Sequence, residues 1–325
     1  MRIAVLVLDG VFDSGLSVIL DTLETANALA EGEVRLAGKA ARAERFEVTV
    51  CALRKTITTH HGFRVPIAAD PGEARPDVVI VPALGDKTLE TITVALDRKD
   101  VIETGELLRG WAAAGVRIAG ACTATFVLAG SGILDGGQAT TTWWLSPVFR
   151  ERFPRVALDE SRMVVESGRV VTAGAALAHV DLALWLVRQR SPTLARVTAR
   201  HLVFDARPSQ GAYTMPDHLA HADPVVERFE RWARRHLTAF ELASAARAAG
   251  VSERTLERRV RAVLGRSPLA YVQDLRVEQA VHQLQTTRDS IEEIATSVGY
   301  QDGVTLRTLL RKKTGRGIRE LRAPG

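Results

Sequence analysis

The stretch "AGACTATFVLAGSGIL" at residues 119–134 decides the fold of the first part of the chain. It begins at the end of an apolar run, "GVRIAGA" at 115–121, which has the length and the lack of polar alternation of a strand buried on both faces. A turn of small residues and a helical pattern follow, with Cys122 at the corner. This order is typical of a nucleophile elbow. It leaves three interpretations of Cys122 open: a nucleophile, the wall of a binding pocket, or a small core residue.

Short apolar runs of the same kind recur up to about residue 190 and alternate with helical periodicity. The expected strands are 2–8, 45–53, 77–84 and 115–121, followed by a hairpin over 162–174. The expected helices between and after them are 17–29, 101–115 and 178–190. Strands with little polar alternation, separated by amphipathic helices, predict an α/β domain in which helices cover a parallel sheet.

The composition sets the broad class of the protein. With 325 residues, 46% hydrophobic and 25% charged, the chain is long enough for two ordinary globular domains. The two cysteines, Cys51 and Cys122, form no CxxC pair, so we expect neither a disulfide framework nor a metal site, and no cofactor. Asp9 interrupts the first apolar run too early for a signal peptide, and no apolar run reaches about 18 residues. We therefore expect a cytoplasmic protein without membrane contact.

Charge is unevenly distributed along the chain. Residues 221–325 hold 19 Lys and Arg against 13 Asp and Glu, whereas residues 1–220 hold 24 against 25. The stretch "FDARPSQGAYTMPDHLAH" at 204–221 is rich in Pro, Gly and polar residues without a steady period, which is typical of a linker. We therefore predict a first domain over 1–203 and a basic domain over 222–325. A basic module suggests a polyanion partner, although a solvated basic surface explains the charge equally well.

The second domain shows only helical patterns. The expected helices are 223–237, 241–249, 253–264, 267–285, 290–298 and 303–313. In "ARAAGVSERTLERRV" (246–260), Gly250 ends one helix and Ser252 caps the next, which predicts a helix-turn-helix unit. In "IEEIATSVGYQDGVTLRTLLRKK" (291–313), Gly299 and Asp302 take the same places. Small residues in the first helix of each unit, Ala246 and Ala295, permit the close crossing of the two helices.

This half of the chain resembles the DNA-binding domain of the AraC/XylS family of transcription regulators. The resemblance lies in "AGVSERTLERRVRAVLGRSPLAYVQDLRVEQAVHQL" (249–284) and "DSIEEIATSVGYQDGVTLRTLLRKKTG" (289–315). It implies two helix-turn-helix units joined by one long helix, with double-stranded DNA as the partner. Ala245, Val260 and Leu310 depart from the larger residues usual in the family, and "GRGIRELR" replaces a Gly-x-Ser-Pro segment. We expect these changes to alter core packing more than DNA binding.

The first recognition helix presents Arg254, Glu257 and Arg258 on one face by their helical spacing, and the family's base-contacting positions coincide with them. Arginine binds guanine through O6 and N7, and glutamate accepts a hydrogen bond from cytosine N4. The alternative is that these side chains form an ordinary solvated surface.

The second recognition helix carries a less polar face. Val304 suits contact with a thymine methyl group, and the other expected base contacts are Arg307 and Thr308. The end of this helix is basic, which favours contact with phosphate groups. The residues concerned are Arg311, Lys312 and Lys313.

Residues 1 to about 190 resemble the ThiJ/PfpI branch of the class I glutamine-amidotransferase-like superfamily, most closely the form fused ahead of AraC-type domains. The resemblance lies in "AGACTATFVLAGSGILDGGQATTTWW" (119–144), "VILDTLETAN" (18–27) and "TAGAALAHVDLALWLV" (172–187). It implies a flavodoxin-like, amidotransferase-like layered fold with Cys122 at the family's elbow. In an elbow the helix dipole favours the thiolate, and backbone N–H groups face an anion.

Several positions speak against catalysis by Cys122. Hydrolytic relatives often have histidine directly after the cysteine, where this chain has Thr123, and the fused regulators commonly have histidine where this chain has Thr142. Gly15 stands where other relatives carry an acidic residue, although Asp13 is near it in sequence. His179 is either a structural histidine of the interior or a partner for the cysteine, with the structural role favoured.

We therefore expect a binding pocket built on a former enzyme site. Backbone N–H groups at the elbow would bind an anionic group, and Trp143 or Trp144 would offer an aromatic face to a cationic amine. The resemblance implies a small nitrogenous metabolite as the ligand. The expected ligand-binding residues are Cys122, Thr123, Thr141, Thr142 and Trp143. Ordinary core packing remains the alternative for each of them.

Two functions remain in view. The first is a sequence-specific, DNA-binding transcription regulator that is controlled by a small-molecule effector, acts as a homodimer, and has RNA polymerase as a further candidate partner. The second is a cysteine-dependent hydrolase or hydratase that uses Cys122, Thr123 and Asp13.

Overall fold

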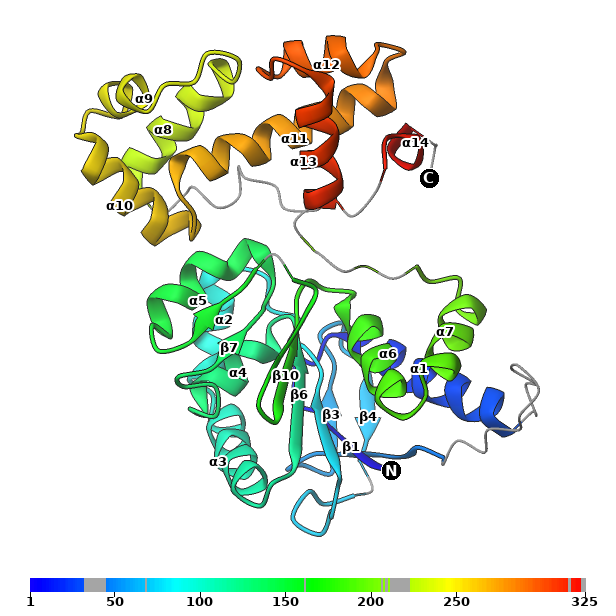
Figure 1. The fold of residues 1–325 in the computed structure, drawn as a ribbon. Coiled ribbons are helices and arrows are strands. Elements are labelled where there is room, and N and C mark those ends of the chain that lie inside the picture. Colours follow the sequence, from blue (N-terminus) through cyan, green and yellow to red (C-terminus); the bar gives the residue numbers. More distant parts are fainter. Residues whose placement is uncertain are drawn as a thin grey trace. The chain divides into compact units, whose positions relative to one another are not determined.

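The structure is a computed structural model that describes residues 1–31, 45–67, 69–160, 162–205, 207, 210, 223–314 and 317–322. The chain divides into two compact units, Met1–Gln210 and Gly211–Gly325. Figure 1 shows an α/β unit followed by an all-helical unit. This confirms the predicted fold class, and each unit is described separately below.

The first unit is built on a six-stranded sheet with the strand order β2-β1-β5-β6-β10-β9. Neighbouring strands pair in parallel except β9, which pairs antiparallel with β10 as the predicted hairpin. The strands are β1 (Arg2–Leu6), β2 (Glu47–Cys51), β5 (Val78–Val81), β6 (Arg117–Ala121), β9 (Val164–Ser167) and β10 (Val170–Ala173).

Helices cover both faces of this sheet (Figure 1). One face carries α1 (Asp13–Glu31), α6 (Ala178–Arg190) and α7 (Pro192–His201), and the other carries α2 (Leu89–Leu96), α3 (Lys99–Ala113), α4 (Ala124–Gly130) and α5 (Ser146–Arg152). Along β1, Ile3 and Val5 join the core under α1 and α6, whereas Ala4 and Leu6 join the opposite core. A strand buried on both faces therefore reads as a continuous apolar run, as the sequence predicted.

Shorter elements were not predicted. Strands β3 (Thr56–Thr58) and β4 (Arg64–Pro66) form a small antiparallel hairpin, and β7 (Gln138–Ala139) pairs with β8 (Ala157–Leu158). A 3-10 turn, η1 (Trp143–Leu145), leads into α5. Segments of two or three residues carry too little periodicity to be recognised from sequence.

The second unit consists of α8 (Pro224–Arg235), α9 (Leu242–Ala249), α10 (Glu253–Leu264), α11 (Pro268–Thr286), α12 (Ile291–Ser297), α13 (Gly303–Thr314) and α14 (Ile318–Arg322). The long α11 joins the pair α9–α10 to the pair α12–α13 (Figure 1). Ala245, Val260 and Leu310, which depart from the AraC/XylS pattern, are all buried. They are core residues, as expected.

The predicted helix caps are present in both helix-turn-helix units. Gly250 ends α9 in the left-handed conformation with φ 73°, and the Ser252 hydroxyl accepts the Thr255 N–H at 3.3 Å. In the second unit Gly299 has φ 87°, and Asp302 Oδ1 accepts the Thr305 N–H at 2.7 Å. Each turn therefore places its second helix through a left-handed glycine followed by a side-chain cap.

The predicted linker over 204–221 lies largely outside the described residues, since 206, 208, 209 and 211–221 are among those not described. Its described part, with Arg207 and Gln210, belongs to the first compact unit. Among the residues that the structure describes, no helix has the length and apolar character needed to span a membrane.

Candidate functional site

Cys122 lies at a strained corner between β6 and α4. Its φ of 56° is a conformation that side chains other than glycine rarely adopt. The backbone holds it there, because Cys122 N–H donates to Ala173 O at 2.7 Å and Thr141 Oγ1 donates to Cys122 O at 2.8 Å. The nucleophile-elbow geometry expected from the sequence is therefore present.

The thiol at this corner is buried and neutral. Only 4% of Cys122 is exposed, and burial raises the pKa of its thiol to about 12, against the weaker opposing effect of hydrogen bonds from Thr123 and Thr142 and of the Lys87 charge. The expectation that the helix dipole would favour a thiolate is wrong here. Helix α4 has only seven residues, and loss of solvation disfavours the charged form of a buried thiol.

The polar residues expected around Cys122 do surround it, but inside the protein. Thr123 is 1% exposed and its Oγ1 donates to Leu84 O at 2.7 Å, while Thr141 and Thr142 are fully buried. Trp143 is 9% exposed, and its ring lies 5.5 Å from that of Trp144 in an edge-on arrangement. The three threonines therefore form a buried polar group beside the elbow.

His179 occupies the space that a side chain on Gly15 would need. An ideal Cβ on Gly15 would lie 2.6 Å from His179 Nε2. That nitrogen accepts the Ala83 N–H at 3.0 Å, and the other ring nitrogen, Nδ1, contacts Ala176 O at 2.6 Å. Burial lowers the pKa of His179 to about 4, so the ring is neutral. His179 is the structural histidine that the sequence favoured.

Asp13 is held by residues of the turn between β3 and β4. Its Oδ2 accepts a hydrogen bond from His61 N–H at 3.2 Å and lies 2.7 Å from His61 Nδ1. Burial raises the pKa of Asp13, but hydrogen bonds from Thr59 and His61 lower it further, so the net pKa is below the ordinary value. Among the described residues, the partners of this carboxylate lie in the β3–β4 turn and do not include Cys122.

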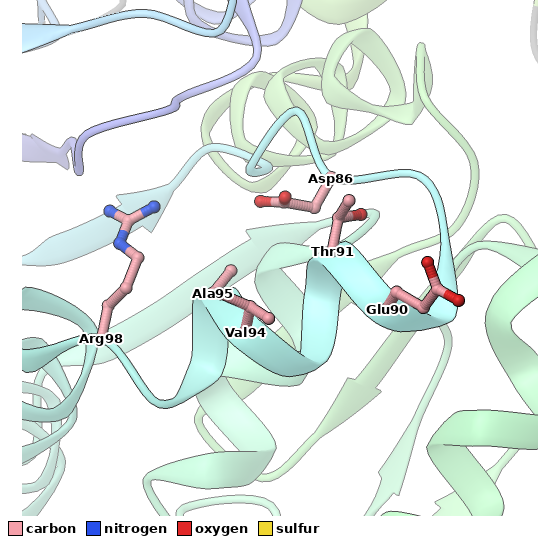
Figure 2. A pocket seen from close by; sticks show the side chains of 6 residues that line it. All are labelled: Asp86, Glu90, Thr91, Val94, Ala95 and Arg98. Carbon is pink, nitrogen blue, oxygen red and sulfur yellow. The ribbon is translucent and has the colours of Figure 1, made fainter.

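A surface pocket of about 370 Å³ lies beside α2. It is lined by Asp86, Glu90, Thr91, Val94, Ala95 and Arg98. Figure 2 shows the Arg98 guanidinium at one end, the Glu90 carboxylate at the other, and Asp86 above the helix between them. This pocket was not predicted from the sequence. The available signal was the position of Asp86 after β5, because ligands of parallel sheets bind beyond the carboxyl ends of the strands.

The pocket combines both signs of charge. Arg98 Nε and Nη2 bind Asp100 at 3.0 and 2.5 Å, and Nη2 also donates to Asp9 O at 2.7 Å. Its Nη1 has no hydrogen-bond partner among the described residues. Burial raises the pKa of Asp86, although the charges of Arg98 and His60 oppose this. The pocket thus offers a fixed guanidinium and two carboxylates within one small volume.

The loop after β5 connects the pocket to the elbow. Leu84 O binds the Thr123 hydroxyl, and the Lys87 charge acts on the Cys122 thiol. Asp86 lies between these two positions.

The predicted base-reading residues of the first helix-turn-helix unit are all exposed. Arg254, Glu257 and Arg258 lie on α10 opposite the buried Leu256 and Val260. The neighbouring Arg259 instead binds Asp223 at 3.1 Å. The buried side of α10 thus fixes the helix and leaves three polar side chains free for a partner.

The second unit presents a similar face. Val304 is 67% exposed, and the other predicted contacts on α13, which are Arg307, Thr308, Arg311 and Lys312, are also exposed. Lys313 differs, because its Nζ binds Asp274 Oδ1 at 2.7 Å. Lys313 therefore holds α13 against α11.

Arg276 of α11 links the two helix-turn-helix units. Its Nε and Nη2 donate to Leu237 O at 2.8 and 2.5 Å, and its guanidinium lies 5.2 Å from the centre of the Tyr300 ring. A Cβ on Gly299 would lie 2.7 Å from Thr238 Cα, so the second turn packs directly on the loop before α9. These contacts fix the orientation of α13 relative to α10.

Known proteins share both halves of this architecture. The DJ-1/PfpI family model matches residues 1–189, and a helix-turn-helix domain model matches residues 245–323. HTH-type transcriptional regulator GlxA of Rhizobium meliloti (strain 1021) is 30% identical over 254 residues, which are 75% of this chain and 75% of the relative. HTH-type transcriptional regulator CdhR of Pseudomonas aeruginosa is 29% identical over 195 residues, 58% of this chain and 57% of the relative.

A solved structure agrees with the fold of the first unit. The AraC family transcriptional regulator from Pseudomonas putida superposes with a TM-score of 0.50 at 20% identity, over 62% of this chain and 98% of that one. The chain therefore belongs to the DJ-1/PfpI family, among the members that carry an AraC-type helix-turn-helix domain.

Proposed function

We propose that the protein is a sequence-specific, DNA-binding transcription regulator controlled by a small nitrogenous metabolite bound in its first unit. The observation that carries this proposal is the pair of helix-turn-helix units whose second helices expose polar faces. Arg254, Glu257 and Arg258 would read bases from α10, and Arg307 and Thr308 from α13. Arg311 and Lys312 would bind phosphate groups at the end of α13.

The charged pocket beside α2 supports a nitrogenous effector. Asp86 and Glu90 suit an ammonium group, and the free Nη1 of Arg98 suits a carboxylate. The loop after β5, which carries Asp86, also interacts with the elbow: Leu84 O accepts from the Thr123 hydroxyl, and the Lys87 charge partly offsets the rise that burial causes in the pKa of the Cys122 thiol. We propose that the effector binds at this edge of the sheet. The ligand contacts expected from the sequence, which are Cys122, Thr123, Thr141, Thr142 and Trp143, are not among the residues that line this pocket.

We propose that Cys122 has no catalytic role. The retained elbow geometry favours a hydrolase or hydratase as the second candidate function. The buried thiol with its raised pKa, the engagement of Asp13 by His61, and the Gly15–His179 packing all disfavour it. A working nucleophile needs a base or acid within hydrogen-bond reach, and among the described residues neither Asp13 nor His179 supplies one.

We also propose a homodimer, because two copies would present four recognition helices to neighbouring half-sites. RNA polymerase remains a candidate partner of the DNA-bound form. Sedimentation of the full chain with and without duplex DNA tests the dimer. A monomer under both conditions would exclude it.

The DNA-binding part is tested by selecting duplexes from a random library with the full chain. We expect enrichment of one sequence motif, and Arg258→Ala should lose the preference at one position of it. Recovery of duplexes without a shared motif would contradict sequence-specific binding.

The effector part is tested by a thermal-shift screen of amines, amino acids and their derivatives on wild type, Cys122→Ala and Asp86→Asn. We expect a hit that stabilises wild type and Cys122→Ala, fails with Asp86→Asn, and is recovered unchanged by mass spectrometry. A compound that is altered by wild type but not by Cys122→Ala would establish the enzyme instead.

A further inference from the structure

Gln210 is the last residue of the first unit, and its side chain is buried within that unit. It is 0% exposed. Three residues earlier, Arg207 Nη2 donates to Leu177 O at 3.0 Å and to Asp181 Oδ2 at 2.5 Å. The two side chains therefore anchor Arg207 and Gln210 in the first unit, just before the chain continues toward the DNA-binding unit.

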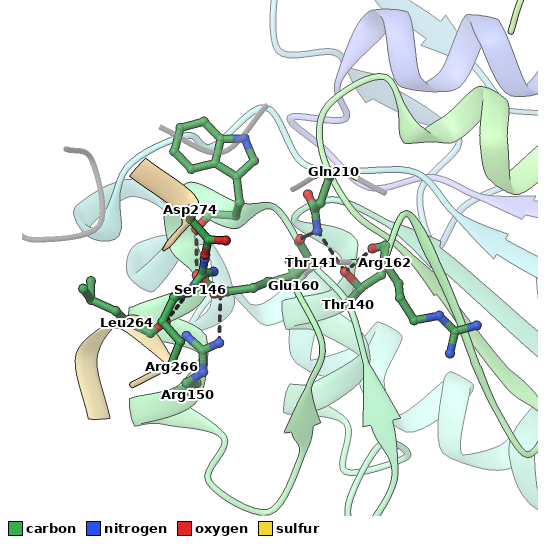
Figure 3. Close-up of polar contacts among 11 residues, drawn as sticks. Thr140, Thr141, Ser146, Arg150, Glu160, Arg162, Gln210, Leu264, Arg266 and Asp274 are labelled. Carbon is green, nitrogen blue, oxygen red and sulfur yellow. Dashed lines mark hydrogen bonds and ion pairs between the residues drawn. The ribbon is translucent and has the colours of Figure 1, made fainter. Parts of the chain in front are cut away.

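The amide of Gln210 is bound by the loop that follows β7. Its Nε2 donates to Thr140 Oγ1 and to Thr141 O, each at 3.0 Å (Figure 3). Buried amide groups require such partners, because an unsatisfied polar group is costly away from water. The position of the Gln210 side chain is therefore fixed by these two acceptors.

A glycine makes room for this amide. An ideal Cβ on Gly174 would lie 2.3 Å from Gln210 Nε2, closer than any real contact. Gly174 directly follows Ala173, whose carbonyl accepts the Cys122 N–H. The end of β10 thus borders both the elbow and Gln210.

One residue, Thr141, touches both Gln210 and the elbow. Its carbonyl accepts from Gln210, and its hydroxyl donates to Cys122 O at 2.8 Å. The other side of the elbow is held by the Thr123 hydroxyl on Leu84 O, in the loop beside the charged pocket. A continuous set of buried hydrogen bonds therefore runs from this loop through the elbow to Gln210.

We propose that Gln210 couples the Cys122 elbow to the DNA-binding unit. A change in the loop at Leu84 would shift the elbow and, with it, Thr141. This shift would alter the hydrogen bond between Thr141 O and Gln210, the residue after which the chain continues toward the recognition helices. This inference rests on the proposed function and names the residue through which its regulation acts. Since coupling between two sites is reciprocal, DNA binding must in turn change the opening of the elbow.

This reciprocity allows a test without the effector. The probe is the rate at which iodoacetamide alkylates Cys122 in the full chain, measured by peptide mass spectrometry with and without saturating selected duplex DNA. Cys51, also fully buried in the first unit, serves as the internal reference, because global opening accelerates both cysteines alike. We expect the duplex to change the Cys122 rate about fivefold or more, the lower range of measured couplings, and to leave the Cys51 rate unchanged.

Two variants remove the contact in different ways. Gln210→Ala deletes the amide, and Gly174→Ala displaces it while Gln210 stays. Both should bind the duplex with wild-type affinity but lose the DNA effect on Cys122. Gln138→Ala, an exposed glutamine on β7, is the matched control and should keep the effect.

The outcomes separate the two proposals. An equal DNA effect in wild type and in both variants, or no effect in wild type that binds the duplex, would overturn the role of Gln210 and leave the regulator intact. Failure of wild type to bind any selected duplex would overturn the proposed function and this coupling with it.

Discussion

The imidazole of His179 fills the place of a side chain on Gly15, with Nε2 2.6 Å from where the glycine Cβ would stand. The same nitrogen accepts the Ala83 N–H, so the ring cannot move aside without leaving that amide unpaired. An acidic residue at position 15 and the observed histidine are therefore incompatible in this packing. The elbow is kept, but the space that a side chain at position 15 would need is taken by the His179 ring.

Gly15→Ala should destabilise the first unit by about 1–3 kcal/mol, because the added methyl group overpacks against His179. The control is Gly110→Ala in α3, where nothing lies within 4 Å of the added carbon. That change should be neutral or stabilise by up to about 1 kcal/mol through helix propensity. Urea unfolding of wild type and both variants measures these changes in the free energy of unfolding. Equal stability of Gly15→Ala and wild type would contradict the packing described here.

The buried His179 predicts a dependence of stability on pH. Its pKa falls from 6.5 in the unfolded chain to about 4 in the folded protein. The unfolded chain therefore binds the extra proton between these values, so stability falls as the pH drops from about 6.5 to 4, by about 3 kcal/mol.

Asp181 changes the stability of the folded protein in the opposite direction over part of this pH range. Burial raises the pKa of Asp181 from 3.8 to about 6, although the charge of Arg207 opposes this. The folded protein therefore holds this proton more tightly than the unfolded chain, and the resulting stabilisation is lost as the pH rises from about 4 to 6. The measurement is therefore the difference in unfolding free energy between wild type and His179→Gln at pH 7 and pH 5. A difference that does not change with pH would show that His179 is not neutral when folded.

Mutations should distinguish side chains that contact bases from side chains that contact phosphate groups. Arg254→Ala should cost about 1–3 kcal/mol for the selected duplex and relax the preference at one base. Lys312→Ala should weaken binding to all sequences and reduce the slope of affinity against salt by about one charge. Titrations at several salt concentrations distinguish them. A uniform loss from Arg254→Ala would assign it to the phosphate backbone instead.

Arg276→Met should loosen the relative orientation of the two recognition helices. We expect the insertion of one base pair between the segments read by α10 and α13 to weaken the binding free energy of wild type by about 1–3 kcal/mol, the size of a mismatch penalty. The loss of binding free energy should be smaller for the variant. Arg288→Met, at an exposed position in the loop between α11 and α12, is the control and should retain the wild-type penalty. The same penalty in wild type and Arg276→Met would show that other contacts set the spacing.

Local signals in the sequence were sufficient for the parallel sheet, the elbow at Cys122 and the helix-turn-helix units. A buried strand, a left-handed glycine such as Gly250 and a cap such as Ser252 act over a few neighbouring residues. The state of the Cys122 thiol could not be predicted, because it depends on burial by distant segments. The same holds for the contact of Gln210 with Thr141, which joins residues 69 positions apart.

The residues that line the pocket beside α2 could not be predicted from the sequence for the same reason. Glu90 and Val94 share a helix, but Asp86 and Arg98 reach the pocket from the segments on either side of it. Arg98 is held in place by Asp9 O and Asp100. Sequence spacing indicates the edge of the sheet where ligands bind, and the selection of side chains requires the packed fold.

The proposed function requires that the two helix-turn-helix units read a defined DNA sequence. The most direct test is a fluorescence anisotropy titration of the full chain against the selected duplex and a scrambled duplex of equal composition, at moderate salt. We expect the selected duplex to bind at least about 10³-fold more tightly than the scrambled duplex. Equal affinity for the two duplexes would contradict it.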